Sequence, residues 1–121
     1  MEVVDLYRKK DRKNSMEKVD NFAKIFEIIG SKTRLKILGI ISDEEKCVNF
    51  LSKKLKLSQP TVSYHLKLLS NIGLVKQHKT AQWVRYKLNK DRLKELISGF
   101  FSIYGILHMK EKNKRSSLSK K

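Results

Sequence analysis

The chain has 121 residues, and 40% of them are hydrophobic, which is enough for one core in one domain of ordinary size. Its 28 Lys and Arg against 12 Asp and Glu give a formal net charge of +16 at pH 7, so the expected partner is a polyanion, nucleic acid before an anionic membrane surface. A single cysteine rules out a disulfide framework within the chain, and no apolar stretch approaches the roughly 20 residues of a membrane span. The first residues also lack a signal-peptide pattern, so we expect a cytoplasmic protein with no membrane partner rather than a secreted toxin or a multidomain enzyme.

The two ends of the chain are charged and show little apolar periodicity. We expect a basic, flexible N-terminal tail over residues 1–15, a folded domain over 16–109 and a basic C-terminal tail over 110–121. The tails hold too few apolar side chains to become ordered through burial. Added phosphate contacts and simple solvation both remain open as their role.

Apolar side chains recur at spacings of three and four over residues 16–29 and predict a first helix. A second helix begins after Ser31, a suitable N-cap, and ends near residues 42–43. A shorter third helix is expected over 49–56, with Asn49 as its N-cap. Its expected inward side chains are Phe50, Leu51 and Leu55.

The fourth helix is expected over residues 59–71, closed by Gly73. Ser58 precedes it as an N-cap, and Pro60 falls in its first turn, where the missing N–H costs no hydrogen bond. Only a tight turn separates it from the third helix. Two short helices joined in this way form a helix-turn-helix.

After Gly73 the apolar period changes to that of strands. We expect a two-stranded hairpin over 74–78 and 82–88 with its tip at residues 79–81. Asn89 is expected to cap a last helix that runs from Lys90 to about Met109.

The fourth helix divides into two faces at about 100° per residue. Val62, Leu66 and Leu69 form the apolar face, whereas Ser63, Tyr64, Lys67 and Asn71 lie opposite. The second set consists of hydrogen-bonding groups of the kind that bind base edges and phosphates. An ordinary amphipathic helix is the alternative. His65, at the flank, is expected to be partly buried and hydrogen-bonded; a residue that contacts bases is the alternative.

The positive charge is concentrated between residues 46 and 90, where no Asp or Glu occurs. A lysine-rich solubilising surface is the alternative, although mixed charges would serve solubility as well. The basic side chains of this stretch are Lys46, Lys53, Lys54, Lys56, Lys67, Lys76, Lys79, Arg85, Lys87 and Lys90.

At these residues the sequence resembles the ArsR/SmtB family of winged helix-turn-helix repressors. The most specific match is the stretch 57–69, Leu-Ser-Gln-Pro-Thr-Val-Ser-Tyr-His-Leu-Lys-Leu-Leu. Weaker matches at 31–38, 73–75 and 83–88 follow in family order, so the resemblance covers roughly residues 20–90. It implies a mainly α fold with a small β-hairpin: a three-helix core, a two-stranded wing, and extra N- and C-terminal helices for dimerisation.

The resemblance also implies that the protein binds double-stranded DNA as a homodimer and represses transcription from an inverted-repeat operator, with the helix 59–71 in the major groove. The wing is expected near phosphates or the minor groove. Carried over by position, the expected DNA-binding residues are Ser58, Gln59, Thr61, Ser63, Tyr64 and Lys67 on the helix, and Lys79, Gln82 and Arg85 on the wing.

Three departures from the family pattern concern metals and the wing. Metal sensors of the family often carry Cys-Val-Cys on the third helix, but residues 47–49 read Cys-Val-Asn. The last helix offers only Asp91, Glu95 and His108, at a spacing that does not fit a zinc site. We therefore expect no metal and no cofactor, leave any effector unknown, and interpret Cys47 as a small apolar filler, with a role in pairing or modification left open. Ala81 replaces the usual wing-tip glycine, so a turn without a positive φ is expected.

The last helix is apolar on more than one face, which indicates a partner chain. A two-fold dimer is the favoured use; a lipid, a hydrophobic ligand or another protein are the alternatives. The expected dimer-interface residues are Phe22, Phe26, Leu96, Phe100, Tyr104 and Leu107.

Together these features predict a sequence-specific DNA-binding transcriptional regulator. The alternatives are an architectural protein that binds DNA without sequence preference, and a small interaction module whose winged helix contacts proteins. No Gly-rich phosphate loop, nucleophile elbow or metal-ligand motif occurs, so we do not expect an enzyme.

Overall fold

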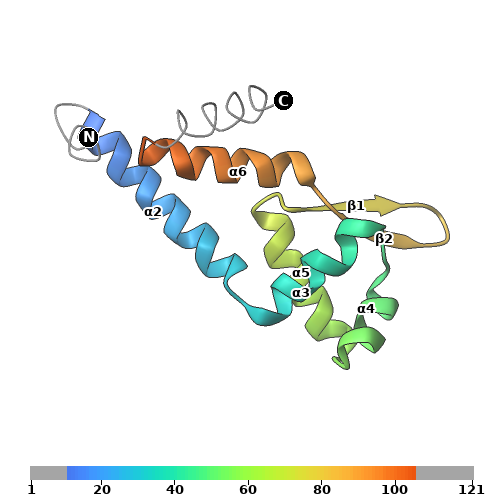
Figure 1. Cartoon of the computed structure of the whole chain (residues 1–121). Helices are drawn as coiled ribbons and strands as arrows, with labels where there is room; N and C mark the ends of the chain where they lie inside the picture. The colour runs from blue at the N-terminus through green and yellow to red at the C-terminus, as the bar shows by residue number, and fades with distance from the viewer. Residues whose placement is uncertain (1–10, 106–121) are drawn as a thin grey trace, which may run out of the picture. The chain divides into compact units, whose positions relative to one another are not determined.

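The computed structural model describes residues 11–105, with side chains from Met16 onward. The elements in chain order are α2 (Asp11–Ile29), α3 (Lys32–Asp43), α4 (Val48–Leu55), α5 (Gln59–Asn71), β1 (Val75–Lys79), β2 (Val84–Leu88) and α6 (Lys90–Ile103) (Figure 1). This confirms the predicted fold class, a mainly helical chain with one β-hairpin. None of the described helices is long and apolar enough to cross a membrane.

The chain divides into two compact units. The central unit is Lys24–Leu93, and the terminal unit combines the chain up to Ala23 with the chain from Lys94 onward. Helix α2 begins at Asp11, inside the stretch expected to be a tail. Apolar periodicity did not predict the first turn of α2, because the residues of that turn are mostly charged. The remaining predicted tail residues, 1–10 and 110–121, lie outside the described part of the chain.

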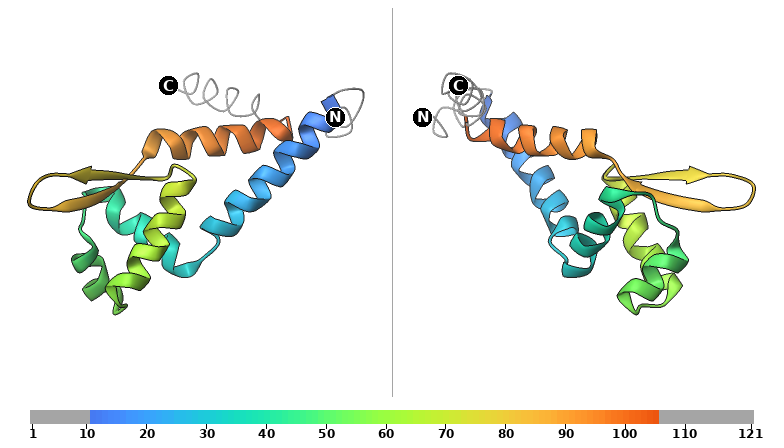
Figure 2. Two further views of the ribbon diagram at one scale, coloured as in Figure 1. Left: turned by 180° about the vertical axis from the view of Figure 1, so that it is seen from behind. Right: turned by 45° about the vertical axis from the view of Figure 1, so that its right-hand side comes forward.

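The core of the central unit is built from one apolar face each of α3, α4 and α5 and from the base of the hairpin. It consists of Ile37, Leu38, Ile41, Leu51, Val62, Leu66, Leu69, Leu74, Val75 and Leu88. The predicted apolar face of α5 is therefore confirmed as its buried face. The hairpin projects beyond the helices of this unit in every view (Figures 1 and 2).

Helices α4 and α5 form the predicted helix-turn-helix, and local caps fix the turn between them. Lys56 adopts the left-handed conformation at the end of α4, with a φ of 59°, and the Ser52 hydroxyl donates to the Leu57 carbonyl. Ser58 then caps α5 as predicted, because its Oγ accepts from the Thr61 N–H at 3.2 Å. Helix α5 has the bounds that were predicted for it.

Two expectations about α4 are wrong. Its N-cap is Cys47, whose Sγ accepts from the Phe50 N–H at 3.4 Å, so the helix begins before Asn49. Phe50 is 38% exposed rather than inward, and the Lys46 ammonium lies 4.3 Å from its ring centroid. An eight-residue helix buries only a narrow stripe, and Leu51 occupies it.

The two strands pair antiparallel, with Val75 opposite Leu88 and Lys79 opposite Val84. Lys46 adds an isolated bridge to Tyr86 on the outer edge of β2. The loop is longer than expected and spans residues 80–83. Thr80 closes it, because its Oγ1 accepts from the Gln82 and Trp83 N–H groups at 3.2 and 3.1 Å. No loop residue has a positive φ, which confirms the expectation drawn from Ala81.

In the terminal unit, α2 and α6 pack through aromatic side chains. The rings of Phe22 and Phe100 meet edge to face at 5.9 Å, and Gly99 leaves room for the Phe22 ring, which would lie 3.1 Å from a Cβ at that position. Asn89 caps α6 as predicted, but the helix ends at Ile103 rather than near Met109. Gly105 follows with a φ of 71°, which turns the chain out of the helix. Residues 106–109 lie outside the described range.

Candidate nucleic-acid interface

Helix α5 presents a polar face to solvent along its whole length. Ser63, Tyr64, Lys67 and Asn71 are all exposed, and Tyr64 is 57% exposed, the highest value among the exposed large hydrophobic residues of the described chain. Gln59, in the first turn, is also exposed and donates from its amide to Asn49 Oδ1 at 3.1 Å. The face combines donors and acceptors with one cation, which is the chemistry that contacts base edges and phosphates.

The N-terminus of α5 is a favourable place for a phosphate. Its first turn contains no acidic residue, and the free backbone N–H groups of a helix start attract anions. Ser58 has a structural role here, since its hydroxyl accepts from the Thr61 backbone and donates to Thr61 Oγ1 at 2.8 Å. Thr61 Oγ1 accepts that bond, so its own hydroxyl hydrogen remains available to a ligand.

Helix α5 is tied to α3 by a bond that the sequence did not predict. Arg34 Nε donates to His65 Nδ1 at 3.1 Å, and Arg34 Nη1 donates to the Ile28 carbonyl at 3.0 Å. Burial and the neighbouring Arg34 charge lower the pKa of His65 below its ordinary value of 6.5. The partly buried, hydrogen-bonded state expected for His65 is confirmed, whereas its partner lies 31 residues away and left no local signal.

The wing carries the remaining predicted contacts, Lys79, Gln82 and Arg85, all of them exposed. The Arg85 guanidinium lies 4.1 Å from the Trp83 ring centroid, which holds it over the indole face. His78 packs edge to face on the same ring and also contacts Glu45, with 3.2 Å between Nδ1 and Oε1. Trp83 therefore orders the cationic end of the hairpin, a role that the sequence analysis missed.

The comparisons with known proteins agree with this geometry. A family model described as bacterial regulatory protein, arsR family, matches residues 31–77. A helix-turn-helix-type transcriptional regulator of Methanocaldococcus jannaschii is 41% identical over 83 residues, which make up 68% of this chain and 93% of that protein. The chain belongs to the arsR family.

Two further relatives carry more specific names. The arsenical resistance operon repressor of Escherichia coli is 41% identical over 66 residues, 54% of this chain and 56% of that protein. The solved structure of reduced HlyU, a transcriptional activator of Vibrio cholerae, is 36% identical and matches with a TM-score of 0.56 over 74% of this chain and 97% of that chain. Both the predicted resemblance and the prediction of a DNA-binding transcriptional regulator rather than an enzyme are confirmed.

Side chains that could bind a metal ion do not cluster among the described residues. Within 16–105, no three His, Cys, Asp or Glu side chains gather as they would around a metal ion. Cys47 is half-buried and serves as the N-cap of α4, and Asn49 accepts from Gln59. His108 lies outside the described residues.

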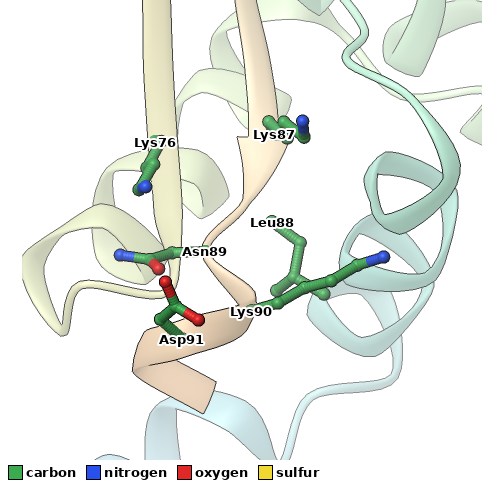
Figure 3. A pocket seen from close by; sticks show the side chains of 6 residues that line it. All are labelled: Lys76, Lys87, Leu88, Asn89, Lys90 and Asp91. Atoms are coloured by element: carbon green, nitrogen blue, oxygen red, sulfur yellow. The ribbon is translucent and has the colours of Figure 1, made fainter. Parts of the chain in front are cut away.

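A hollow of about 210 Å³ lies at the base of the wing, where β2 meets α6. Lys76, Lys87, Lys90, Leu88, Asn89 and Asp91 line it (Figure 3). Lys76 lies over Asn89 and Asp91, whereas Lys87 and Lys90 point away from them (Figure 3). The three ammonium groups therefore do not converge on one ligand, and the hollow extends the basic surface of the wing.

The residues predicted for a dimer interface have different environments. Leu96 is buried and Phe22 and Phe100 are half-buried, whereas Phe26 and Tyr104 are 38% and 37% exposed. Leu107 lies outside the described residues. Ile97 and Met16, at 39% and 51% exposure, add apolar surface to the terminal unit.

Proposed function

We propose that this arsR-family protein is a homodimeric repressor that recognises an inverted-repeat operator through α5 in the major groove and the wing against phosphates or the minor groove. The single observation that carries the proposal is the polar, acid-free outward face of α5, which begins at a capped N-terminus. In helix-turn-helix docking, the N-terminal part of the second helix contacts the bases. Gln59, Thr61, Ser63 and Tyr64 occupy that part.

A dimer is supported by the apolar surface of the terminal unit. Met16 on α2, Ile97 on α6 and Tyr104, directly after the end of α6, are exposed there. A two-fold axis would use the same surface on each copy and would set two recognition helices about 34 Å apart, one turn of DNA. An operator read by such a dimer is an inverted repeat.

Selection from a randomised duplex library at about 0.15 M salt tests sequence recognition. We expect an enriched inverted repeat. Tyr64→Ala and Gln59→Ala should each weaken binding to it by about 1–3 kcal/mol and leave binding to scrambled duplex unchanged. Asn71→Ala, at the far end of the same helix, is the matched control and should have a smaller effect. Equal losses on selected and scrambled duplexes would contradict the assignment of α5 as the reading helix.

Transcription from a promoter that carries the selected sequence tests the direction of regulation. The Escherichia coli relative is named a repressor and HlyU an activator. We expect the protein to lower transcription, because a dimer seated on a promoter blocks polymerase. Increased transcription would show that the protein is an activator and not a repressor. In the library selection, tight binding to every duplex without enrichment of a sequence would indicate an architectural protein.

A further inference from the structure

We propose that the hollow between α5 and the hairpin seats one backbone phosphate of DNA, with Tyr86 and Lys67 as its principal donors. This inference rests on the proposed function, because it takes α5 and the wing to lie in neighbouring grooves. The hollow has a volume of about 220 Å³ and lies wholly within the central unit. Ser63, Leu66, Lys67, Ser70, Gln77 and Tyr86 line it.

The lining of this hollow suits an anion. It provides the Lys67 ammonium, the hydroxyls of Ser63, Ser70 and Tyr86, and no carboxylate. Its apolar wall is Leu66, which is 1% exposed and anchored in the core. A phosphate oxygen accepts hydrogen bonds only, whereas a base edge carries both donors and acceptors. A concave surface of hydroxyl and ammonium donors therefore matches a phosphate better than a base edge.

One hydrogen bond within the hollow orients its central donor. Gln77 and Tyr86 face each other across the two strands, and Gln77 Nε2 donates to Tyr86 Oη at 3.1 Å. The phenol oxygen therefore accepts from the amide, which leaves its O–H to donate to a ligand. Among the described residues, Tyr86 Oη has no other hydrogen-bond partner. A hydrogen bond received by a hydroxyl also strengthens the one it donates.

The position of the hollow indicates that its phosphate belongs to the backbone strand that passes between α5 and the wing. The sugar-phosphate backbone separates the major groove from the minor groove. A backbone that passes between α5 and the wing must cross the surface that joins them, and this surface contains the hollow. Lys67 also belongs to the exposed face of α5, so its ammonium can reach the same strand. The seat fixes the register of the protein without reading sequence.

Single-phosphate neutralisation on the selected operator tests the seat. Each phosphate in turn is replaced by a methylphosphonate, and binding is measured for the wild type, Tyr86→Phe and Lys67→Gln. We expect one phosphate per half-site whose neutralisation weakens wild-type binding about tenfold. Each variant should lose about tenfold on the native duplex and little more when that phosphate is neutralised. Lys36→Gln, which removes an exposed charge on α3, is the matched control and should keep the full wild-type response.

The salt dependence of binding separates the two donors. Lys67→Gln should reduce the slope of log K against log salt by about one, because one ion pair is lost. Tyr86→Phe should leave the slope unchanged, because a neutral hydroxyl releases no counterion. This salt series can be measured on any duplex, so the seat is tested even if no operator is enriched.

Four outcomes would overturn the inference, and they differ in what they say about the proposed function. If Tyr86→Phe binds DNA as tightly as the wild type while Tyr64→Ala no longer discriminates the operator from scrambled duplex, the phosphate seat is refuted and the proposed function stands. If the binding loss caused by the methylphosphonate adds fully to the losses caused by Tyr86→Phe and by Lys67→Gln, the neutralised phosphate does not lie in the hollow. Saturable binding of inorganic phosphate to the free protein, followed by NMR and abolished in Tyr86→Phe, would assign the hollow to a small phosphate ligand instead. Failure to bind any duplex would remove both proposals.

Discussion

Arg34 joins three helices of the central unit through one side chain. Its own helix is α3, its Nε donates to His65 on α5 at 3.1 Å, and its Nη1 donates to the Ile28 carbonyl on α2 at 3.0 Å. Ile28 lies in the last turn of α2, where carbonyls have no partner within the helix. Replacing Arg34 with Met keeps most of the apolar stem and removes both hydrogen bonds.

The cost of Arg34→Met follows from these two bonds. Hydrogen bonds with a charged partner contribute about 1.5–3 kcal/mol when well buried, and about 1 kcal/mol each is appropriate here because both are only partly buried. We therefore expect the free energy of unfolding to fall by about 2 kcal/mol. With a urea m value of about 1.5 kcal/mol/M, the unfolding midpoint falls by about 1.3 M. Lys36→Met, on the exposed side of α3, should change the free energy by less than about 0.5 kcal/mol.

Urea unfolding at a fixed protomer concentration measures both variants, since association would otherwise shift the midpoint. Equal stability of Arg34→Met and Lys36→Met would refute the assignment of a stabilising role to the Arg34 bonds. A double-mutant cycle with His65→Phe, which removes the Nδ1 acceptor, isolates the long-range bond from the one to Ile28. His65→Asn serves a separate pH test, because Asn presents an oxygen near the position of His65 Nδ1, retains an acceptor for Arg34 and does not titrate.

The lowered pKa of His65 makes the same contact pH-dependent. The folded state favours the neutral imidazole, so the unfolded state binds more protons between pH 6.5 and the lower folded-state pKa. Stability is therefore complete above about pH 6.5 and decreases as the pH falls through that window. The Lys46 ammonium lowers the pKa of Glu44, but that group titrates below 4.5 and lies outside the window. We expect His65→Asn to flatten the decrease between pH 7.5 and 5.5, and an unaltered decrease in that variant would show that another group causes it.

Four further variants test the backbone and the core by urea unfolding. Lys56→Gly should raise the free energy of unfolding by about 0.5 kcal/mol, because the relief of left-handed strain at a φ of 59° exceeds the added entropy of glycine in the unfolded chain. Lys54→Gly, inside α4, should instead lower the free energy of unfolding by about 1 kcal/mol. Gly73→Ala should lower it by about 1–2 kcal/mol, since Gly73 has a φ of 82° and a Cβ there would meet the Arg92 side chain at 3.0 Å. Leu69→Ala should lower it by about 2–5 kcal/mol, because Leu69 is fully buried. A rise with Gly73→Ala or a change below 1 kcal/mol with Leu69→Ala would contradict the described packing.

The sequence predicted the elements whose signals are local. Helix α5 has the predicted bounds because Ser58 and Pro60 mark its start and its apolar face repeats without interruption. The start of α4 was misplaced because a cysteine cap is an uncommon signal, and two neighbouring residues, Cys47 and Asn49, were both able to cap. The candidate DNA-binding face was predictable for the same reason as the helix: periodicity alone sorts its side chains into two sets.

Contacts between distant residues were not predictable in this way. The Arg34–His65 bond, the Gln77–Tyr86 bond and the Glu45–His78 contact each require that the fold be known first. The positions of polar residues in the sequence do not predict which of them come into contact, because the turns and the packing of the fold decide which residues meet. These long-range contacts nevertheless set the position of α5 and the wing, the two elements on which the sequence predicts the candidate DNA-binding side chains.

The distribution of acids shows how the basic surface is kept available to a polyanion. Glu44 and Glu45 directly precede the acid-free stretch and sit closest to it along the chain. Each is engaged locally: Glu44 Oε2 lies 2.8 Å from Lys46 Nζ, and Glu45 lies 3.2 Å from His78 Nδ1. Arg85 rests on the uncharged Trp83 ring, which fixes its position, and its charge also interacts electrostatically with Glu44. In the proposed function, the wing presents this ordered cation to phosphate and the neutral polar groups of α5 discriminate between bases, so affinity and specificity are divided between two elements.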